Sequence, residues 1–444
     1  VWTGERVLEG GDVLCAGGRV VAVGADLSGE PGAAGASVLD ATGCVVIPGL
    51  VNAHHHLLQS AFRTLPGTRH VPMREWLPAM ASAYAAAGID AELCHATASV
   101  GLAEALLCGV TTVADHHLNW PADPAEHLPI AEAVAAAAGE LGARVVLVRG
   151  SAGDDPDVVA QAATDVASRF GSAAGASAPV AGDSAGAGAG VGVVGVAVGP
   201  AGVHSDRPET FAALREVAAR FGLVRRTQAN EQVDTEIALA RYGRRPLELL
   251  DEWGWLEPGV TIAHLCDVTA DEVALLAERG VTATHAPGCD LPMGWGLAPV
   301  GALLDAGVVV GLGTSGGGSN DAGHLLADAR LAMQVAPLLG RPLTAIDALT
   351  LATRGSAVGL ARPELGHLEP GAAADLALFD LGGVADAGVA DPVAGLLWAA
   401  PGRRPRDVVV AGRLVVESGE LVRRSEGAVV AGLHGVLAAR RVTA

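Results

Sequence analysis

Two histidines one residue apart, His54 and His56, follow an apolar run over residues 45–51 that is typical of a buried strand. In a strand, residues i and i+2 point to the same side, so both imidazoles can reach one metal ion beyond its end. A His-x-His pair also occurs in simple His-rich turns, because two ligands alone do not make a site. The pair therefore indicates metal chemistry only if the rest of the chain supplies further ligands.

The length and charge of the chain favour an enzyme that acts on a small molecule. Its 444 residues can hold a barrel of eight strand and helix units, which needs about 250 residues, plus an accessory domain. It carries 29 basic against 49 acidic residues, a formal net charge of -20. Such a charge argues against nucleic acid or an anionic membrane as partner. We expect a neutral or cationic small substrate.

The pattern of cysteines and the hydropathy of the chain indicate in which cellular compartment the protein is found. Six cysteines are scattered without a Cys-x-x-Cys pair, which indicates reduced thiols and neither a disulfide framework nor a structural zinc site. No apolar stretch approaches the length of a membrane span, and no signal peptide is recognisable at the start. The first residue is Val1, so we expect that a short N-terminal piece is missing. We predict a cytoplasmic protein, with a homodimer as the default assembly.

Short Val-rich runs broken by glycine occur at both ends of the chain and predict small antiparallel strands. They lie at residues 12–14, 19–23, 38–39, 44–47, 375–379 and 407–417. We therefore predict one composite β-sandwich domain built from residues 1–47 and 362–444. A Gly/Ala/Ser-rich stretch at 171–191 is predicted to be a flexible surface loop.

Residues 48–361 alternate apolar strand candidates with stretches of helical spacing. The strand candidates are 45–53, 110–115, 143–149, 192–198, 223–228, 260–265, 281–286 and 307–314. Eight strands that alternate with helices predict an α/β fold, a (β/α)8 TIM barrel, whose chemistry lies at the carboxyl ends of the strands. Seven of the fourteen histidines fall at those ends, which a chance scatter would rarely produce.

Taken alone, each of two residues near the strand ends has both a structural and a functional interpretation. His264 alone is also consistent with a hydrogen-bonded core histidine. Glu231, three residues beyond a strand, is either a solvated loop carboxylate or a proton shuttle that faces the pocket. The histidines as a set favour a functional pocket over a structural one.

Four motifs of the chain resemble the amidohydrolase superfamily. They are residues 48–56 (PGLVNAHHH), 109–115 (GVTTVAD), 319–321 (SND) and 366–376 (GHLEPGAAADL). Residues 293–299 (MGWGLAP) are similar to triazine hydrolases. The nearest branch is that of the cytosine deaminase-type hydrolases, which holds triazine hydrolases and 8-oxoguanine deaminases. The resemblance covers essentially the whole chain and implies one divalent ion, zinc or iron.

The resemblance also implies a ligand set for that ion: His54, His56, Gln228, His264 and Ser315. Two of these depart from the family pattern. Ser315 stands where an Asp is usual, although triazine hydrolases also carry a hydroxyl there. Gln228 replaces a His, and an amide oxygen is a weaker ligand for zinc.

A fixed positive charge accompanies the change at Gln228. Arg226 replaces a second usual His, and it lowers the affinity for a cation unless a carboxylate such as Glu231 neutralises it.

The leading hypothesis is therefore a metal-dependent aminohydrolase, or deaminase, that cleaves a C–N bond of a nitrogen heterocycle with metal-activated water. A C–halide bond of the same cyclic amidine-like ring is an alternative target. We expect Glu231, His264 and His285 to transfer protons. The residues expected to contact the substrate are Gln59, Trp76, His116, Trp295 and Asn320. The second hypothesis is a divergent member with a weakened or absent metal site that binds a heterocycle or performs non-hydrolytic acid/base chemistry.

Overall fold

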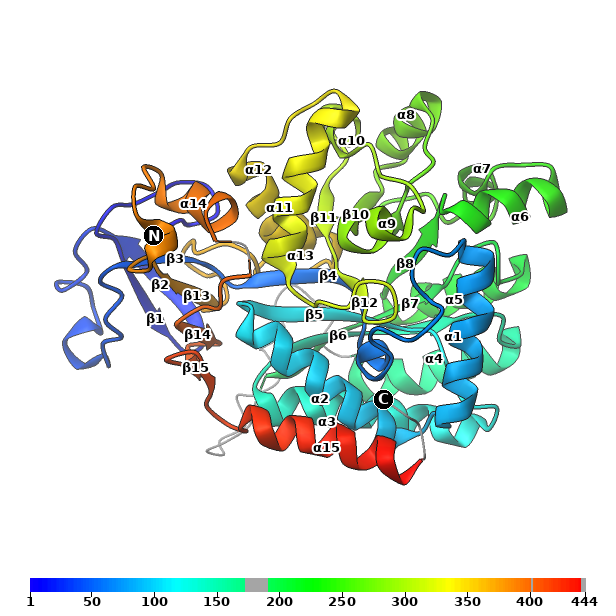
Figure 1. The fold of residues 1–444 in the computed structure, drawn as a ribbon, viewed down its shortest axis with the longest axis horizontal. Helices are drawn as coiled ribbons and strands as arrows, with labels where there is room; N and C mark the ends of the chain where they lie inside the picture. The colour runs from blue at the N-terminus through cyan, green and yellow to red at the C-terminus, as the bar shows by residue number, and fades with distance from the viewer. Residues whose placement is uncertain (172–190, 401, 441–444) are drawn as a thin grey trace.

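The computed structural model describes residues 1–171, 191–400 and 402–440. Its centre is a curled sheet of parallel strands with helices packed around its outer side (Figure 1). The barrel strands are β4 (Leu50–His56), β5 (Val110–His117), β6 (Arg144–Ser151), β7 (Gly192–Pro200), β8 (Val224–Ala229), β9 (Val260–His264), β10 (Thr282–His285), β11 (Val310–Leu312) and β12 (Ser315–Gly316).

The helices around the barrel follow the strands in chain order. They are α1 (Met73–Ala87), α2 (Ala91–Leu107), α3 (His127–Leu141), α4 (Pro156–Phe170), α5 (Pro208–Phe221), α6 (Gln232–Tyr242), α7 (Pro246–Glu252), α8 (Ala270–Arg279), α9 (Pro287–Met293), α10 (Val300–Asp305), α11 (Leu325–Val335), α12 (Ala345–Thr350) and α13 (Ser356–Gly359). Side-chain caps start several of them: the Asp90 carboxylate accepts from the Leu93 amide at 2.9 Å at the start of α2. Among the described residues, no helix has the length and apolarity needed to cross a lipid bilayer.

The eighth strand is split into two short pieces that close the barrel. β11 pairs with β10, and β12 pairs with β4 in parallel, with Ser315 opposite His55. Between the pieces, a Cβ at Gly313 would lie 2.7 Å from the Cβ of His54, so only glycine lets the chain pass this close to the first strand. The predicted (β/α)8 barrel is confirmed.

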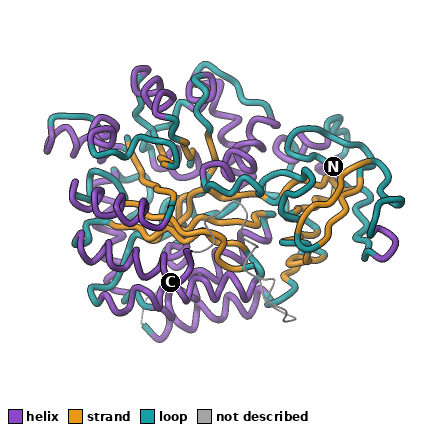
Figure 2. Tube along the Cα trace, turned by 180° about the vertical axis from the view of Figure 1, so that it is seen from behind, coloured by secondary structure: helices purple, strands orange, loops and turns teal. Residues whose placement is uncertain are grey.

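Both chain ends contribute strands to a smaller β domain beside the barrel (Figure 2). A five-stranded antiparallel sheet has the order β16 (Glu420–Leu421), β15 (Arg413–Glu417), β14 (Asp407–Val410), β13 (Leu376–Asp380) and β3 (Cys44–Pro48). A two-stranded sheet is formed by β1 (Asp12–Ala16) and β2 (Arg19–Gly24). The composite origin of this domain is confirmed.

Of two further sequence predictions in these regions, one is wrong and the other falls outside the described residues. Residues 38–39 form no strand, and the Val38 side chain is 90% exposed. This prediction is wrong because two apolar residues without a pairing partner do not make a strand. The Gly/Ala/Ser-rich stretch predicted at 171–191 falls on residues 172–190, which lie outside the described residues.

The C-terminal region also returns to the barrel. Helix α14 (Pro392–Trp398) packs on α11, and α15 (Glu426–Ala439) packs on α2. Both helices lie in the range that we assigned to the β domain. The domain boundaries at residues 47 and 362 therefore stay predictions.

A buried ion pair connects the barrel to the small domain. Arg144 at the start of β6 donates from Nε and Nη2 to the two oxygens of Asp375, at 2.7 and 2.9 Å. Both side chains are at most 3% exposed, and Asp375 also accepts from the Ala411 amide. A bidentate pair of this kind is sensitive to loss of one partner, because the other charge stays buried.

We expect Asp375→Ala to lower the free energy of unfolding by about 3–5 kcal/mol, because the Arg144 charge would remain buried without a counterion. Urea unfolding of the variant against wild type measures this. The control is Glu132→Ala, which removes an exposed pair with Arg169 and should cost about 1 kcal/mol or less. Equal losses in the two variants would contradict the assigned role of Asp375.

Candidate active site

Buried imidazoles gather at the carboxyl ends of the first, second and sixth barrel strands. The ring centre of His54 lies 4.8 Å from that of His56, 5.2 Å from His264 and 5.6 Å from His116. The rings of these pairs meet edge to face, with interplanar angles of 73–87°. The barrel thus brings together three of the predicted ligands and one predicted substrate contact.

Each of three imidazoles in this cluster uses one ring nitrogen to fix its orientation. His56 Nδ1 lies 2.7 Å from the carbonyl oxygen of His116, and His116 Nε2 lies 2.9 Å from the carbonyl oxygen of Gly199. His264 Nδ1 lies 2.8 Å from Oδ1 of Asp290. A ring held through one nitrogen presents the other one in a defined direction.

Three ring nitrogens of the cluster have no hydrogen-bond partner in the described part of the chain. They are Nε2 of His54, Nε2 of His264 and Nδ1 of His116, and all three are buried. Buried polar atoms without a partner are rare in native proteins and call for an explanation. A role as ligands of a bound ion is one such explanation.

Burial controls the charge of most of these rings. Burial, followed by repulsion from the neighbouring histidines, lowers the pKa of His54 well below its usual value. Burial also lowers the pKa of His56 and of His285 to about 4. These imidazoles are therefore neutral at pH 7, the form in which histidine binds metals.

His264 differs because carboxylates surround it. Burial lowers its pKa, but the negative charges of Asp290 and Glu231 outweigh burial and raise the pKa to about 9. A proton and a metal ion are alternative occupants of Nε2, since both use the same lone pair.

Glu231 lies at the start of α6, directly beyond β8. Its side chain is buried, and its Oε1 lies 3.8 Å from Nδ1 of His264. Burial raises the pKa of Glu231 above its usual range. Asp234 fixes the turn by accepting from the backbone amides of Asn230 and His204, at 2.9 and 3.1 Å. The carboxyl of Glu231 is thereby held beside the imidazole cluster.

Arg226 lies two residues before Gln228 and faces the barrel interior. Its guanidinium is buried and donates to the carbonyl oxygens of Ala53 and Gly359. No carboxylate in the described part of the chain forms an ion pair with it, so Glu231 does not neutralise it directly. Burial lowers the pKa of Arg226 to about 10, and the group stays charged at pH 7.

Gln228 and Ser315, the two unusual members of the predicted ligand set, are both buried. Gln228 shares the inner face of β8 with Arg226, and its side chain makes no hydrogen bond to a described residue. Ser315 begins β12 with a φ of 54°.

Several predicted substrate contacts hold the strand-8 loop instead of projecting freely. Gln59 Oε1 accepts from the Gly318 amide at 2.9 Å, and Trp76 Nε1 donates to the Gly318 carbonyl at 3.1 Å. The ring of Trp76 meets that of Trp295 edge to face, 5.2 Å between centres. Gln59 and Trp76 are therefore hydrogen-bonded to the backbone of this loop, and their contact with a substrate stays a prediction.

The side-chain amide of Asn320 also donates its hydrogen bonds to groups of the protein. Its Nδ2 donates to the Thr314 carbonyl and to Oδ2 of Asp328, both at 3.1 Å. Asp328 also accepts from the Gly288 amide at 2.7 Å. Asn320 therefore connects the strand-8 loop to α9 and α11.

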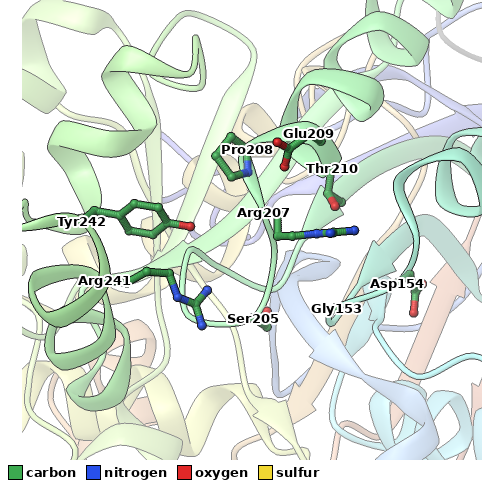
Figure 3. A pocket seen from close by; sticks show the side chains of 9 residues that line it. All are labelled: Gly153, Asp154, Ser205, Arg207, Pro208, Glu209, Thr210, Arg241 and Tyr242. Carbon is green, nitrogen blue, oxygen red and sulfur yellow. The ribbon is translucent and has the colours of Figure 1, made fainter.

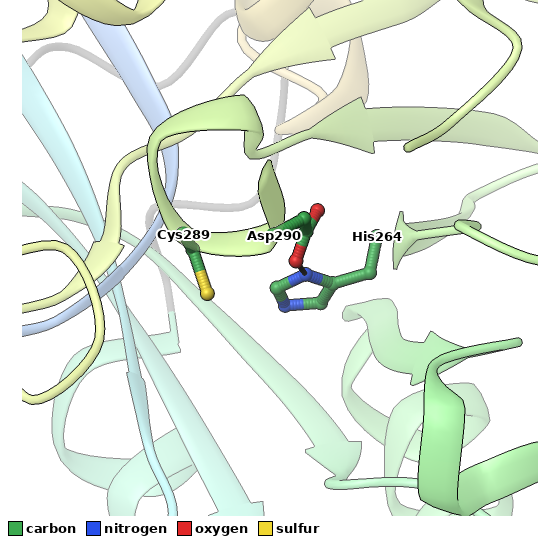
Figure 4. Close-up of side chains that lie close together, drawn as sticks. All are labelled: His264, Cys289 and Asp290. Atoms are coloured by element: carbon green, nitrogen blue, oxygen red, sulfur yellow. Dashed lines mark hydrogen bonds and ion pairs between the residues drawn. The ribbon is translucent and has the colours of Figure 1, made fainter. Parts of the chain in front are cut away.

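Sequence reasoning missed two residues of the cluster, Cys289 and Asp290. Their ligand atoms and those of His264 all lie within 4.8 Å of one another (Figure 4). Both residues follow β10 on the short helix α9, four and five positions after His285. Their position just beyond a barrel strand could have indicated that they belong to the site.

The structure also contains a cavity of about 560 Å³, whose lining Figure 3 shows. Its lining includes Ser205, Arg207, Thr210, Arg241 and Tyr242. No member of the imidazole cluster lines it, so we do not assign the catalytic site to this cavity.

The sequence and structure of the chain were compared with those of known proteins. Residues 45–415 match the model of the amidohydrolase family. The chain belongs to this family. The resemblance read from the motifs is thereby confirmed.

The curated relatives match over nearly their whole length. An 8-oxoguanine deaminase of Pseudomonas aeruginosa is 34% identical, over 94% of this chain and 92% of the relative. An isoxanthopterin deaminase of an unknown prokaryotic organism is 31% identical, over 92% and 87%.

A solved structure is similar over almost the entire chain. The zinc complex of atrazine chlorohydrolase TrzN from Arthrobacter aurescens superposes with a TM-score of 0.87 at 35% identity, covering 98% of this chain and 96% of that one. This amidohydrolase thus shares its complete architecture with a zinc enzyme.

We expect Gln59→Met to lower the free energy of unfolding by about 1–3 kcal/mol, because the buried Gly318 amide loses its acceptor. Urea unfolding measures the change. Gln161→Met, on the exposed face of α4, is the control and should stay within about 0.5 kcal/mol of wild type. A Gln59 variant as stable as the control would show that this hydrogen bond does not hold the loop.

Proposed function

We propose that this amidohydrolase is a metal-dependent deaminase that hydrolyses a C–N bond of a nitrogen heterocycle. The observation that carries the proposal is the pair of buried, unpartnered Nε2 atoms of His54 and His264 beside the buried carboxyl of Glu231. This arrangement combines a cation site with a proton acceptor. The deaminases among the relatives support the proposed reaction class.

The residues present fit a single zinc or iron ion. Leaving Nε2 of His54 and His264 without partners costs free energy that a bound cation would offset. His54, His56 and His264 would hold the ion, with Gln228 and Ser315 as the remaining candidates. When bound, the ion supplies Lewis acidity, which makes water a better nucleophile at neutral pH. The zinc complex of the similar TrzN structure supports this assignment.

Glu231 would move the proton in the reaction. It would take a proton from the attacking water and deliver it to the departing amine. Its burial favours this role, because burial raises the pKa of the carboxyl and makes it a better proton acceptor than an exposed glutamate. His285, buried and neutral, would be the second acid/base group.

The proposed substrate is a flat bicyclic heterocycle with an exocyclic amine, of the 8-oxopurine or pterin class. The names of two relatives support this choice, and the faces of Trp76 and Trp295 would form an apolar wall beside the ring. A neutral heterocycle also agrees with the net charge of -20. The proposal is tested by measuring the ammonia that the protein releases from 8-oxoguanine and from isoxanthopterin. A chlorotriazine is assayed in parallel for the release of chloride.

We expect Glu231→Gln to reduce turnover by a factor of about 10² to 10⁴, because the amide cannot carry the proton. The fold and the metal content should stay as in wild type. Initial rates of ammonia release and elemental analysis of the same sample measure both quantities. Glu236→Gln, exposed on the same helix, is the control and should keep full turnover.

Full activity in Glu231→Gln would remove Glu231 from the mechanism and leave His285 as the proton acceptor. A variant that loses metal along with activity would instead indicate that Glu231 helps to hold the ion. Either result contradicts the role proposed for Glu231.

We expect Gln228→His to retain metal at higher chelator concentrations than wild type, because imidazole is a stronger zinc ligand than an amide oxygen. Turnover need not rise in parallel. A titration with a chelator, followed by metal analysis, compares wild type, Gln228→His and the surface control Gln161→His. Equal retention in all three would mean that Gln228 is not at the ion, and would favour the alternative of a weakened metal site.

A further inference from the structure

The carboxyl end of the seventh barrel strand adds a thiol to the imidazole cluster. The Cys289 and His264 side chains are 1% exposed, and Asp290 between them is fully buried. The ligand atoms of the three residues lie within 4.8 Å of one another. In Figure 4 the sulfur of Cys289 lies to one side of the imidazole of His264, while Asp290 meets Nδ1 of that ring.

Hydrogen bonding leaves one nitrogen of His264 available beside this sulfur. Asp290 occupies Nδ1 at 2.8 Å, and Nε2 is buried with no partner among the described residues. A carboxylate that holds one nitrogen of an imidazole typically orients the other one toward a metal ion. Asp290 is therefore a positioning residue, and Cys289 is the neighbouring side chain with a free ligand atom.

The charge of the site supplies a second argument. The proposed ligands His54, His56, Gln228 and Ser315 are all neutral, and the buried guanidinium of Arg226 is nearby. The buried carboxylates beside the cluster already have roles, because Asp290 is hydrogen-bonded to His264 and Glu231 is assigned to proton transfer. A thiolate is the anionic ligand that fits the chemistry of zinc.

Metal binding would change the charge of Cys289. Burial and the negative charges of Asp290 and Glu231 raise the pKa of its thiol well above its usual value, so the side chain is a thiol without an ion. A coordinating thiol is deprotonated by the metal ion itself.

We propose that Cys289 binds the divalent ion as a thiolate, together with His264. The inference rests on the proposed function only in assuming that an ion occupies the imidazole cluster. Its chemistry is a ligand exchange: the sulfur–metal bond forms, the thiol proton passes to solvent, and no electron is transferred. A thiolate ligand would also favour zinc over harder ions such as magnesium.

Cobalt substitution tests the inference without an activity assay. The wild-type protein is stripped of metal, reloaded with Co²⁺, and examined by absorption spectroscopy, with bound cobalt measured by elemental analysis. We expect a thiolate-to-cobalt charge-transfer band in the near ultraviolet. We expect the band to disappear in Cys289→Ser while circular dichroism stays as in wild type.

Cys266→Ser is the matched control. Cys266 is a free, partly buried cysteine two residues after His264, but it does not belong to the group within 4.8 Å. The control should keep the band at wild-type intensity. If Cys289→Ser does not fold, the spectrum of the wild type alone still decides whether a thiolate binds the ion.

Stoichiometric cobalt without the charge-transfer band would overturn the inference and leave the proposed metal site intact. A band that survives in Cys289→Ser or disappears in Cys266→Ser would overturn it as well. Wild-type protein that binds no cobalt would overturn both the inference and the proposed function.

Discussion

Burying several imidazoles at the mouth of a barrel is unfavourable unless each ring nitrogen finds a partner, and this constraint shapes the candidate site. The protein supplies one partner to each of three rings: a carbonyl to His56, a carbonyl to His116 and the Asp290 carboxylate to His264. The opposite nitrogens of His116 and His264, and Nε2 of His54, remain without partners among the residues that the structure describes. Rings that are held on one side and free on the other are prepared for a ligand that the protein does not itself contain.

The rest of the barrel keeps these rings in place. The split eighth strand reaches both neighbouring strands only because Gly313 allows a close approach to His54. Gln59 and Trp76 then hold the following loop by its backbone at Gly318. The geometry of the candidate site in this protein therefore depends on contacts between the first and the last strand, which are far apart in the sequence.

The sequence allowed the strand ends, and hence most of the cluster, to be predicted. His54 and His56 could be placed together because side chains alternate along a strand, and His264 and Glu231 because parallel strands in a barrel end at the same face. The partners of Gln59 and Asn320 could not be predicted, since both side chains bind the backbone of a loop whose path only the folded chain defines. Cys289 and Asp290 were missed because they lie on a short helix, beyond the residues that end the strand.

The central claim is that the imidazole cluster holds a divalent ion. Elemental analysis of the purified wild-type protein and of His54→Ala, each purified without added metal, tests it most directly. The account predicts about one zinc or iron ion per chain in wild type and a large loss in the variant, with the fold retained. Wild-type protein that releases ammonia from a heterocycle at full rate while containing no such ion would contradict the account.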